Sequence, residues 1–565
     1  MSSDKKDPSR GPSPSRSADA DADTETVPVT ADFKPTRDFV LAFSSMIMVV
    51  LAVAFEATTL AVALPIMSTD LGGTALQAFW SGTGFLLASA VFQPTVAGLS
   101  AVFGRSNLIY ISSAFFAAGS LIAALAQSFP VVVAGRVIQG GGGGGIIALT
   151  EVIVTDLVPL ADRGRWLAIL SAVWSIGTVA GPLIGAGFAQ NVSWRWIFWI
   201  NLPIIAVGAV MVFLFLKQAK LPGNMVQKLK RFDWIGAVLF TVGSGSFLFG
   251  LSSGGVMYEW RSWQVLVSIL VGAAVVAAFG VWEVVFAERL GVELLVPAGL
   301  FNNFSTISLY AQAVLHGAIL WSLIYFLILY YQAILFYSPI TSAVATLPET
   351  LTVAPSGMVV GIIASITGRY RWSLWSGWVI ATLGTGLLYL LDENTSIAQW
   401  IFINIPVGLG TGMLFPAMGL GIQASCPPLL NAEAAAFFSF TRTFGQSVGV
   451  AVSGVLFQNV FRRELEKLPA FAADALHLSR DATIVVGVIQ GMETSPQKTD
   501  LITAYNDALR IVWILLTALA GVSLLLSIPV KGFSLQREHV TKQALVAGEK
   551  ASDAEPDVEK GGVKA

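Results

Sequence analysis

The sequence predicts an all-α, polytopic membrane protein with fourteen transmembrane helices, arranged as two pseudo-symmetric six-helix bundles plus two inserted helices. Hydrophobic residues make up 55% of the 565 positions and charged residues only 12%, whereas a soluble domain carries about 25% charged residues. Apolar runs long enough to cross a bilayer recur between residues 39 and 528. Glycine patterns in the first part of the chain recur in the last part at a nearly constant offset, which indicates two copies of one unit.

The apolar runs give the candidate spans directly. They lie at residues 39–66, 79–99, 107–127, 131–153, 166–189, 195–216, 234–253, 263–284, 305–331, 341–364, 372–391, 398–421, 433–457 and 508–528. The predicted organisation is a disordered tail, a six-helix bundle, a linker with two extra helices, a second six-helix bundle and a second disordered tail, at residues 1–37, 38–216, 217–304, 305–528 and 529–565. The N-terminal residues are rich in Ser, Asp, Pro and Lys and have no apolar core, which is typical of a disordered segment and not of a cleavable signal peptide.

Arg and Lys are distributed unevenly between two alternating sets of loops. One set is basic, with Arg105, Arg163, Arg165, Lys217, Lys220, Lys228, Lys230, Arg231, Arg289, Arg369 and Arg371. The alternate set holds little beyond Arg195 and Arg261. The positive-inside rule therefore predicts that both tails are cytoplasmic and that residues 458–507 form an external loop.

The internal repeat appears in three places. At an offset of 268, the small residues of one stretch recur in another, and these pairs are Gly177 with Gly445, Gly181 with Gly449, and Gly185 with Ser453. The same offset carries Gly140, Gly142 and Gly144 onto Gly408, Gly410 and Gly412, and Gly104-Arg105 recurs as Gly368-Arg369 at an offset of 264. Chance matching in a glycine-rich chain is the alternative explanation. Parallel halves of this kind are a transporter architecture, with the binding site between the halves near the midplane.

Several classes of site are excluded by composition. Cys426 is the only cysteine and the three histidines are scattered, so we predict no metal site and no disulfide. The run Gly140–Gly145 is not a phosphate-binding loop, because no Lys-Ser or Lys-Thr follows it and its flanks are apolar. We therefore predict no cofactor and no use of ATP. The net charge of −2 suggests no nucleic-acid partner, and nothing in the sequence demands more than a monomer.

The stretch from Gly177 to Gly185 places three glycines at i, i+4 and i+8, on one stripe of a helix. Small residues let another helix approach closely in lipid, and Pro182 removes a backbone donor and bends the helix beside the stripe. This pattern predicts a kinked, close-packing face of the kind that lines a substrate path. A glycine zipper with only a packing role is the alternative.

Motifs along residues 38–530 resemble those of one transporter family. They are Ala63-Leu64-Pro65, Gly98-Leu99-Ser100, Phe103-Gly104-Arg105, Gly135-Arg136-Val137-Ile138-Gln139-Gly140, Gly181-Pro182, Trp194-Arg195-Trp196-Ile197-Phe198-Trp199-Ile200-Asn201-Leu202-Pro203, Thr367-Gly368-Arg369-Tyr370-Arg371 and Arg442-Thr443-Phe444-Gly445-Gln446-Ser447-Val448-Gly449. Together they resemble the major facilitator superfamily, in its branch of fourteen-span drug:proton antiporters, and most of all the fungal pumps that export toxins and secondary metabolites. By this resemblance Gly177, Gly181, Pro182 and Gly185 correspond to the antiporter motif of the fifth span.

The chain departs from the family pattern at two positions. The family usually has an aspartate where this chain has Ala101, and that acid pairs with a cytoplasmic arginine to steady one state of the transporter. Asp156 with Arg163 and Arg165 is a candidate replacement, and we predict cytoplasmic gating charges at Arg105, Asp156, Arg163, Arg165 and Arg369. In the first span the usual aspartate is replaced by Glu56, which keeps the charge on a longer side chain.

Two opposite charges are predicted within the first bundle. Glu56 lies about ten residues from the outer end of its span and Arg136 about six, so at about 1.5 Å per residue they have similar depth. A charge within the bilayer costs about 2.5–3.5 kcal/mol on insertion scales, which makes each a functional candidate. Our hypothesis is that Glu56 carries the transported proton and that Arg136 tunes its affinity. The alternative is a structural salt bridge between spans one and four.

Four other polar residues are candidates for a substrate cavity: His316, Glu349, Gln139 and Arg442. His316, near the middle of its span, suits binding of a proton or a polar substrate group, and a neutral histidine bonded to a neighbouring helix is the alternative. Glu349 suits attraction of a cationic substrate unless it lies near enough to the surface to be hydrated. Arg442 either faces the cavity or extends toward the cytoplasmic surface. Asn394, in the sequence Asn-Thr-Ser, is a candidate glycosylation acceptor on an external loop.

The predicted function is proton-coupled efflux of small, mainly apolar organic compounds, such as a toxin, secondary metabolite or drug, by alternating access. Uptake of an iron chelate or nutrient in the same fold is the first alternative, and a non-transporting membrane receptor is the second. The predicted partners are a small-molecule substrate, protons and the lipid bilayer. The predicted location is the cell membrane, with the vacuolar membrane as the alternative.

Overall fold

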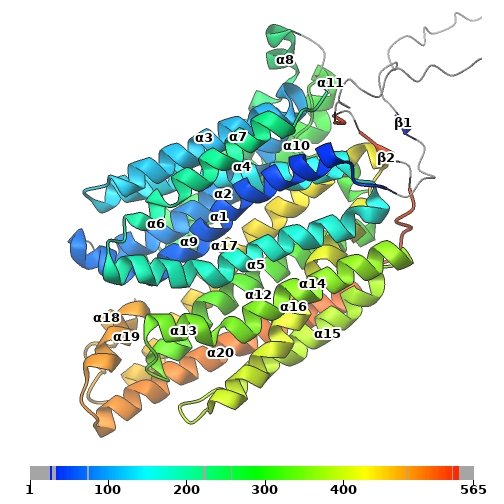
Figure 1. Cartoon of the computed structure of the whole chain (residues 1–565). Coiled ribbons are helices and arrows are strands. Elements are labelled where there is room, and N and C mark those ends of the chain that lie inside the picture. The colour runs from blue at the N-terminus through cyan, green and yellow to red at the C-terminus, as the bar shows by residue number, and fades with distance from the viewer. Residues whose placement is uncertain are drawn as a thin grey trace, which may run out of the picture.

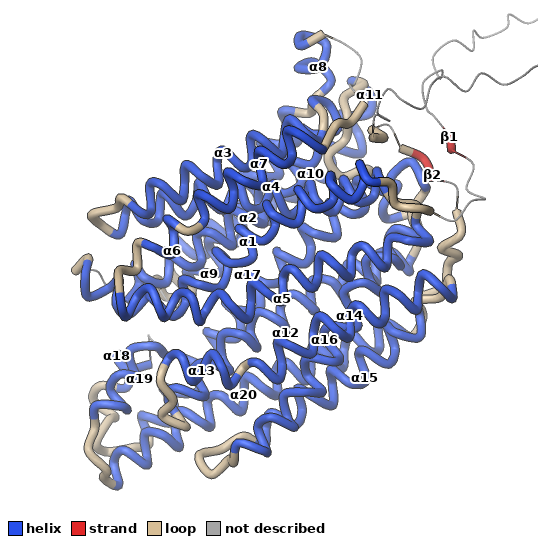
Figure 2. Tube along the Cα trace, viewed as in Figure 1, coloured by secondary structure: helices blue, strands red, loops and turns tan. Residues whose placement is uncertain are grey.

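In the computed structural model the chain is almost entirely helical (Figures 1 and 2). The structure describes residues 26–27, 33–72, 75–219, 224–255, 257–479, 482–537, 539–541 and 543–545. Fourteen helical segments among these residues are long and apolar enough to cross a membrane, as predicted from the apolar runs. Most of the predicted N-terminal tail, and residues 546–565 of the predicted C-terminal tail, lie outside the described residues.

The first group of helices comprises α1 (Arg37–Asp70), α2 (Ala75–Phe103), α3 (Arg105–Ala124), α4 (Phe129–Leu157), α5 (Leu160–Asn191), α6 (Trp196–Trp199) and α7 (Asn201–Phe215). The helix α4 packs against both α2 and α3, and α1 packs against α5 and α7. Together they form the upper bundle in Figure 1, which we call the first half.

The connecting region begins with the short basic helix α8 (Met225–Arg231), whose first turn is closed by the reciprocal hydrogen bonds of Asn224 and Gln227. The inserted helices are α9 (Trp234–Ser253) and α10 (Trp263–Val281), and α10 continues as a π-helix through Trp282–Ala287. They pack on each other, and α9 also contacts α2 and α17. The short helices α11 (Glu288–Leu290) and η2 (Ala298–Phe301) lead to the second group.

The second group comprises α12 (Phe304–Ala333), α13 (Pro339–Ala345), α14 (Leu347–Thr367), α15 (Arg371–Leu387), η3 (Leu388–Leu390), α16 (Ile397–Ser425), η4 (Pro428–Leu430), α17 (Asn431–Glu466), α18 (Ala475–Ser479), α19 (Ala482–Gly491) and α20 (Pro496–Ser527). We call it the second half. Its helices repeat the contacts of the first, since α16 packs against α14 and α15, and α12 packs against α17 and α20. The two-residue strands β1 (Thr26–Val27) and β2 (His539–Val540) pair antiparallel.

The repeated glycines mark equivalent contacts in the two halves. A Cβ atom on Gly140 would collide with the backbone of Phe85 in α2, and one on Gly142 with that of Phe116 in α3. Their counterparts Gly408 and Gly410 stand in the same way against α14 and α15. The glycine pattern therefore reports where α4 and α16 each fit between two neighbours, which supports the internal repeat against chance matching.

Two predicted boundaries are wrong. The predicted external loop 458–507 is largely helical: α17 continues to Glu466, α18 and α19 follow, and α20 begins at Pro496. Ser495 caps α20 by accepting a hydrogen bond from the Lys498 amide (3.2 Å), and Pro496 suits the first helical position. Hydropathy located only the apolar parts of α17 and α20, because polar turns that extend beyond a membrane carry no apolar signal, and α18 and α19 are too short to be recognised as spans.

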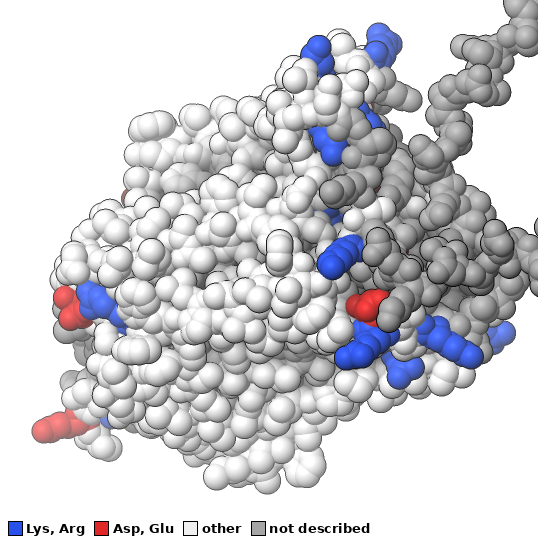
Figure 3. Space-filling model, turned by 45° about the horizontal axis from the view of Figure 1, so that its top comes forward, with Lys and Arg blue, Asp and Glu red and all other residues white. Residues whose placement is uncertain are grey.

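The C-terminal tail is ordered further than predicted. Beyond α20, Val530 and Leu535 are buried, and so is Gln543 near the end of the described residues. Both described ends of the chain lie at one face of the molecule (Figure 1), which we call the tail face. Lys and Arg gather at this end, while the sides are dominated by uncharged residues (Figure 3). This distribution agrees with a membrane-embedded body, because large apolar side chains such as Phe213, Trp263 and Ile366 are more than 70% exposed there.

Candidate functional site

Glu56 and Arg136 form an ion pair inside the first half, as their predicted depths suggested. Both side chains are buried. The Arg136 guanidinium also donates to the carbonyl of Ser81 in α2 (2.8 Å) and to Oε1 of Gln139 (2.8 Å), and it lies 4.5 Å from the centre of the Phe85 ring. The cation is thus held in place from several sides by α1, α2 and its own helix.

The second oxygen of Glu56 accepts a hydrogen bond from Nδ2 of Asn201 in α7. This role of Asn201 was not predicted from the sequence, although a polar residue within the apolar run 195–216 was a usable signal. Gln139 was predicted to line the substrate cavity, but this is wrong: its side chain connects Arg136 to Oγ of Ser120 in α3 (2.7 Å). The position of a residue along a helix predicts which face of the helix it occupies but not which residue it contacts. The face of α4 that carries Gln139 points into the first half. The network therefore joins five helices of the first half.

The corresponding position in the second half is neutral. The offset of 268 carries Arg136 onto Asn404, which donates to the hydroxyl of Tyr331 in α12 (2.7 Å) and to the carbonyl of Trp400 (2.9 Å). The two halves share a fold, but only the first has a charged pair at this place. This asymmetry makes Glu56 and Arg136 candidates for a role beyond packing.

A pocket of about 660 Å³, including the part open to solvent, lies between the two halves. Its walls come from α5 of the first half and from α12, α14, α16 and α17 of the second, with Ser171, Trp174, Ser175, Thr178, His316, Leu320, Trp321, Ile324, Glu349, Thr350, Val353, Thr411, Gly412, Phe415 and Arg442. Three of the four predicted cavity residues, His316, Glu349 and Arg442, therefore lie together. The lining is mostly apolar with a few polar groups, which is the usual character of a small-molecule site.

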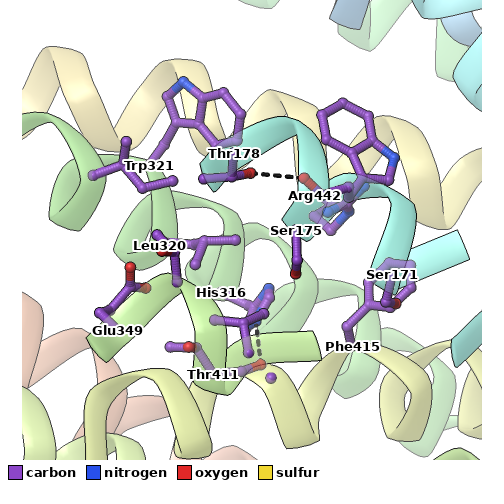
Figure 4. Close-up of a pocket in the computed structure, with 15 residues that line it drawn as sticks. Ser171, Ser175, Thr178, His316, Leu320, Trp321, Glu349, Thr411, Phe415 and Arg442 are labelled. Carbon is purple, nitrogen blue, oxygen red and sulfur yellow. Dashed lines mark hydrogen bonds between the residues drawn. The ribbon is translucent and has the colours of Figure 1, made fainter. Parts of the chain in front are cut away.

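Glu349 and Arg442 lie apart in this pocket, with Leu320 and His316 between them in the view of Figure 4. Glu349 is 1% exposed, and neither of its carboxyl oxygens has a hydrogen-bond partner among the described residues. Arg442 is 9% exposed, its Nε atom has no partner in the same set, and its guanidinium lies 4.7 Å from the centre of the Phe415 ring. Surface hydration of Glu349 and extension of Arg442 to the cytoplasmic surface, the two alternatives from the sequence, are both inconsistent with this burial.

His316 donates through Nε2 to the carbonyl of Thr411 in α16 (2.9 Å), which requires a proton on Nε2. Its Nδ1 atom has no partner among the described residues. The ring is therefore anchored to a neighbouring helix on one side and leaves an acceptor on the other. The bond to a neighbouring helix, predicted as one alternative, is present, and binding of a proton or a polar substrate group by His316 stays a prediction.

The glycine stripe of α5 does not line the pocket, so the expectation that this face borders a substrate path is wrong. A Cβ on Gly177 would meet Ala54, one on Gly181 would meet Thr58, and one on Gly185 would meet the carbonyl of Thr59, all in α1. Thr58 also donates to the carbonyl of Gly177 (3.0 Å). The pocket is lined by other faces of α5. The stripe instead fixes α5 against the helix that carries Glu56.

We expect Gly185→Val to destabilise the protein by about 1–3 kcal/mol, because the added side chain has no space against α1. Gly187→Val is the matched control, since a Cβ on Gly187 meets nothing within 4 Å. Thermal unfolding of the two purified variants in the same detergent compares them. Equal midpoints for both would show that α1 and α5 can separate at no cost.

The halves are joined between the pocket and the tail face. Arg163 in α5 is buried and donates to Oε1 of Gln423 in α16 (2.7 Å). Gly164 follows it and packs against the backbone of Gly361 in α14. In the other pair of facing helices, level with the pocket, Nε2 of Gln93 in α2 donates to Oγ1 of Thr443 in α17 (3.0 Å). The tail side of the pocket is therefore closed in this structure.

The predicted gating charges separate into two groups. Arg105 forms an ion pair with Asp156 (3.1 Å between Nε and Oδ2). Arg163 lies near enough to interact with the charge of Asp156 but donates to the carbonyl of Thr155 (2.7 Å), so the charge cluster proposed from the sequence includes Arg163, while the ion pair itself is with Arg105. The side chains of Arg165 and Arg369 are exposed at the tail face, and neither forms an ion pair with a described residue. Spacing located the charges at one face but could not distinguish which of three arginines reaches the acid.

Asn394 is exposed in the loop between η3 and α16, at the face opposite the tails. Its backbone amide donates to Asp392 (2.9 Å), and Ser396 of the same motif caps α16. Glycosylation at Asn394 stays a prediction.

Residues 46–236 match the Major Facilitator Superfamily. The chain is 46% identical over 530 residues to the MFS transporter L2 of Phoma sp., covering 94% of this chain and 88% of that one. It is 33% identical over 516 residues to the efflux pump FUS6 of Gibberella moniliformis, covering 91% of both chains. Among solved structures, the proton:xylose symporter XylE superimposes with a TM-score of 0.55 at 10% identity, over 89% of this chain and 98% of that one, which shows the shared fold.

Proposed function

Because this chain belongs to the major facilitator superfamily, we propose that it is a proton-coupled efflux transporter that exports small, mainly apolar organic compounds by alternating access. The observation that carries the proposal is the pocket between the halves, whose carboxyl group at Glu349 is buried without a partner among the described residues. Contacts of Arg163 with Gln423 and of Gly164 with Gly361 join the halves on its tail side. Relatives similar over most of the chain are named efflux pumps, which supports export over uptake. The charge distribution supports placing both tails in the cytoplasm, and the cell membrane is the location that we propose.

In this proposal the substrate lies between Glu349 and Arg442. The aromatic side chains of Trp174, Trp321 and Phe415 offer a surface for a flat apolar body. A buried carboxyl group without a partner gains most from a substrate that donates a hydrogen bond or carries a positive charge. We therefore expect Glu349 to select compounds with a hydroxyl, amine or ammonium group at one end.

Glu56 is the proposed proton site, and its connection to the pocket is a chain of close contacts. Ala54, Thr58 and Thr59 flank it on α1 and meet the glycine stripe of α5. The neighbouring face of α5 lines the pocket. Protonation of Glu56 would weaken its bonds to Arg136 and Asn201, so α1 and α5 could shift together relative to the second half. Arg136 would tune the proton affinity by stabilising the charged carboxylate.

Transport in proteoliposomes tests the proposal. Dyes of different charge, such as cationic ethidium and anionic carboxyfluorescein, are offered with a proton gradient imposed in either direction. Antiport predicts that ethidium accumulates when the lumen is acidic, since outward proton flow then drives inward substrate flow. Accumulation only with an alkaline lumen would instead establish symport, and hence the uptake alternative.

The same assay is repeated with Glu349→Leu, a variant that keeps the proposed proton site and removes the proposed substrate contact. We expect it to raise the ethidium concentration needed for half-maximal transport by about tenfold or more, which corresponds to about 1.4 kcal/mol of lost interaction. An unchanged concentration dependence would remove Glu349 from the substrate site. Gradient-independent binding without any flux would favour the receptor alternative.

A further inference from the structure

The described residues after α20 form a segment that contacts both halves of the protein. We call residues 529–545 the C-terminal strap, of which positions 538 and 542 lie outside the described residues. In Figure 1 it is the red segment that leaves the lower bundle, runs along the tail face and reaches β2 beside the upper bundle. It lies across the face at which the halves meet.

The first part of the strap is attached to the second half. The amide of Lys531 donates to Oγ of Ser305 (3.0 Å), and the amide of Phe533 donates to the hydroxyl of Tyr370 (3.4 Å). Further on, Arg537 donates to the carbonyl of Cys426 (2.8 Å). Since α20 belongs to the same half, this part remains attached whichever way the halves move.

The last part of the strap is attached to the first half at two places, and the first of these is Gln543. Gln543 is 3% exposed, and its Oε1 atom accepts from the amide of Arg105 (3.0 Å) while its Nε2 atom donates to the carbonyl of Ser100 (3.4 Å). Its own carbonyl accepts from Nε2 of Gln218 (3.0 Å). Gln543 therefore connects the turn between α2 and α3 to the segment that follows α7.

A second attachment involves the acid of the Arg105–Asp156 pair. Oγ1 of Thr541 donates to Oδ1 of Asp156 (3.3 Å), and the His539 ring bonds the backbone carbonyl of Asp156 (3.1 Å). The last described residues continue this contact, because the amide of Ala219 donates to the carbonyl of Ala544 (3.0 Å). The strap thus covers a charged pair that belongs wholly to the first half.

These two sets of contacts lead to a conformational consequence. Opening at the tail face would move Ser100, Arg105 and Asp156 away from the second half, to which the strap is tied by α20. The bonds of Thr541 and Gln543 would then have to break. We propose that the C-terminal strap is a latch that favours the state closed at the tail face, and that its release from the first half accompanies opening. This inference rests on the alternating-access part of the proposed function, and on no assumption about substrate or proton.

Two truncations separate the latch from the rest of the tail. A chain ending at Arg537 keeps the contacts to the second half and loses those to the first. A chain ending at Leu545 keeps the whole strap and is the matched control. The double variant T541V/Q543A removes the side-chain bonds while leaving the length unchanged.

Distances across the tail face give the readout. In each chain Cys426 is replaced by serine, and spin labels are attached at Asn107→Cys in the first half and Thr367→Cys in the second, both exposed positions. Double electron–electron resonance in lipid nanodiscs then reports the separation of the halves without any transport. Thermal midpoints and size-exclusion profiles confirm that each chain is folded.

We expect truncation at Arg537 to raise the long-distance, open fraction about fivefold or more, because several hydrogen bonds specific to one state are lost. The double variant should shift the distribution in the same direction by less, and truncation at Leu545 should leave it unchanged. Identical distributions for all four chains would overturn the latch. If the distances shift as expected but proteoliposomes show no proton-driven flux, the latch stands and only the proposed proton-coupled transport is refuted. The two outcomes can be distinguished because the distance measurement requires no transport.

Discussion

Arg136→Met is expected to destabilise the protein by about 3–5 kcal/mol, because it leaves the Glu56 carboxylate buried without its counter-charge. The methionine side chain keeps most of the volume and the contact with the Phe85 ring, so the loss is electrostatic and not a cavity. The amide of Asn201 still bonds to Glu56 but supplies no charge. Thermal and denaturant unfolding in one detergent measures the effect.

A double-mutant cycle with Glu56→Leu separates the pair from its surroundings. Removing both charges should restore part of the stability, since a buried ion pair is frequently replaceable by apolar residues. Restoration should be incomplete, because Gln139 and Asn201 lose partners in the double variant. Additive effects of the two single substitutions would mean that the charges do not interact, against the contact in the structure.

The sequence was sufficient to predict the helical architecture and the charged pair, for identifiable physical reasons. A bilayer requires long apolar helices, so composition alone locates them. Glu56 and Arg136 are costly enough at their depth that each requires a partner, and equal depth in one bundle left few choices. The glycine repeat was equally informative, because a backbone contact permits no side chain at Gly140 or at its counterpart Gly408.

The pocket was predicted only in part, because a helix position does not specify its neighbour. His316, Glu349 and Arg442 come from three different helices, and only packing places them around one space. Gln139 was assigned to the cavity from its position alone, yet it faces Ser120 inside the first half. The glycine stripe of α5 was placed on the wrong face for the same reason.

The C-terminal strap was missed because its order has no compositional signal. Residues 529–545 follow the last apolar run and mix polar and charged residues with scattered apolar ones, which is typical of a disordered tail. Their order arises from specific hydrogen bonds, such as that from Thr541 to Asp156, and from burial of Val530 and Leu535, on a surface formed by distant parts of the chain. Such a docked segment cannot be distinguished from a free one by hydropathy or periodicity.

Glu56→Gln is expected to abolish proton-driven accumulation while preserving exchange of substrate across the membrane. Glutamine resembles the protonated carboxyl group in size and hydrogen bonding, so the chain can still change state around its substrate. Glutamine cannot bind and release a proton, so the proton gradient can no longer drive the conformational change through this residue. In proteoliposomes, accumulation of ethidium with an acidic lumen should fall to the level without a gradient, and exchange of labelled for unlabelled dye should continue.

The matched control is Glu466→Gln, which removes the same charge from an exposed pair with Arg462 at the end of α17. Surface pairs contribute about 0–1 kcal/mol, so this variant should transport normally. Full gradient-driven accumulation by Glu56→Gln would reduce the Glu56–Arg136 pair to a structural salt bridge and move the proton site elsewhere. Glu349 would then be the next candidate, because it is the pocket carboxyl group without a partner among the described residues. Loss of exchange together with accumulation, in a variant that remains folded, would show instead that the pair is needed for the conformational change itself.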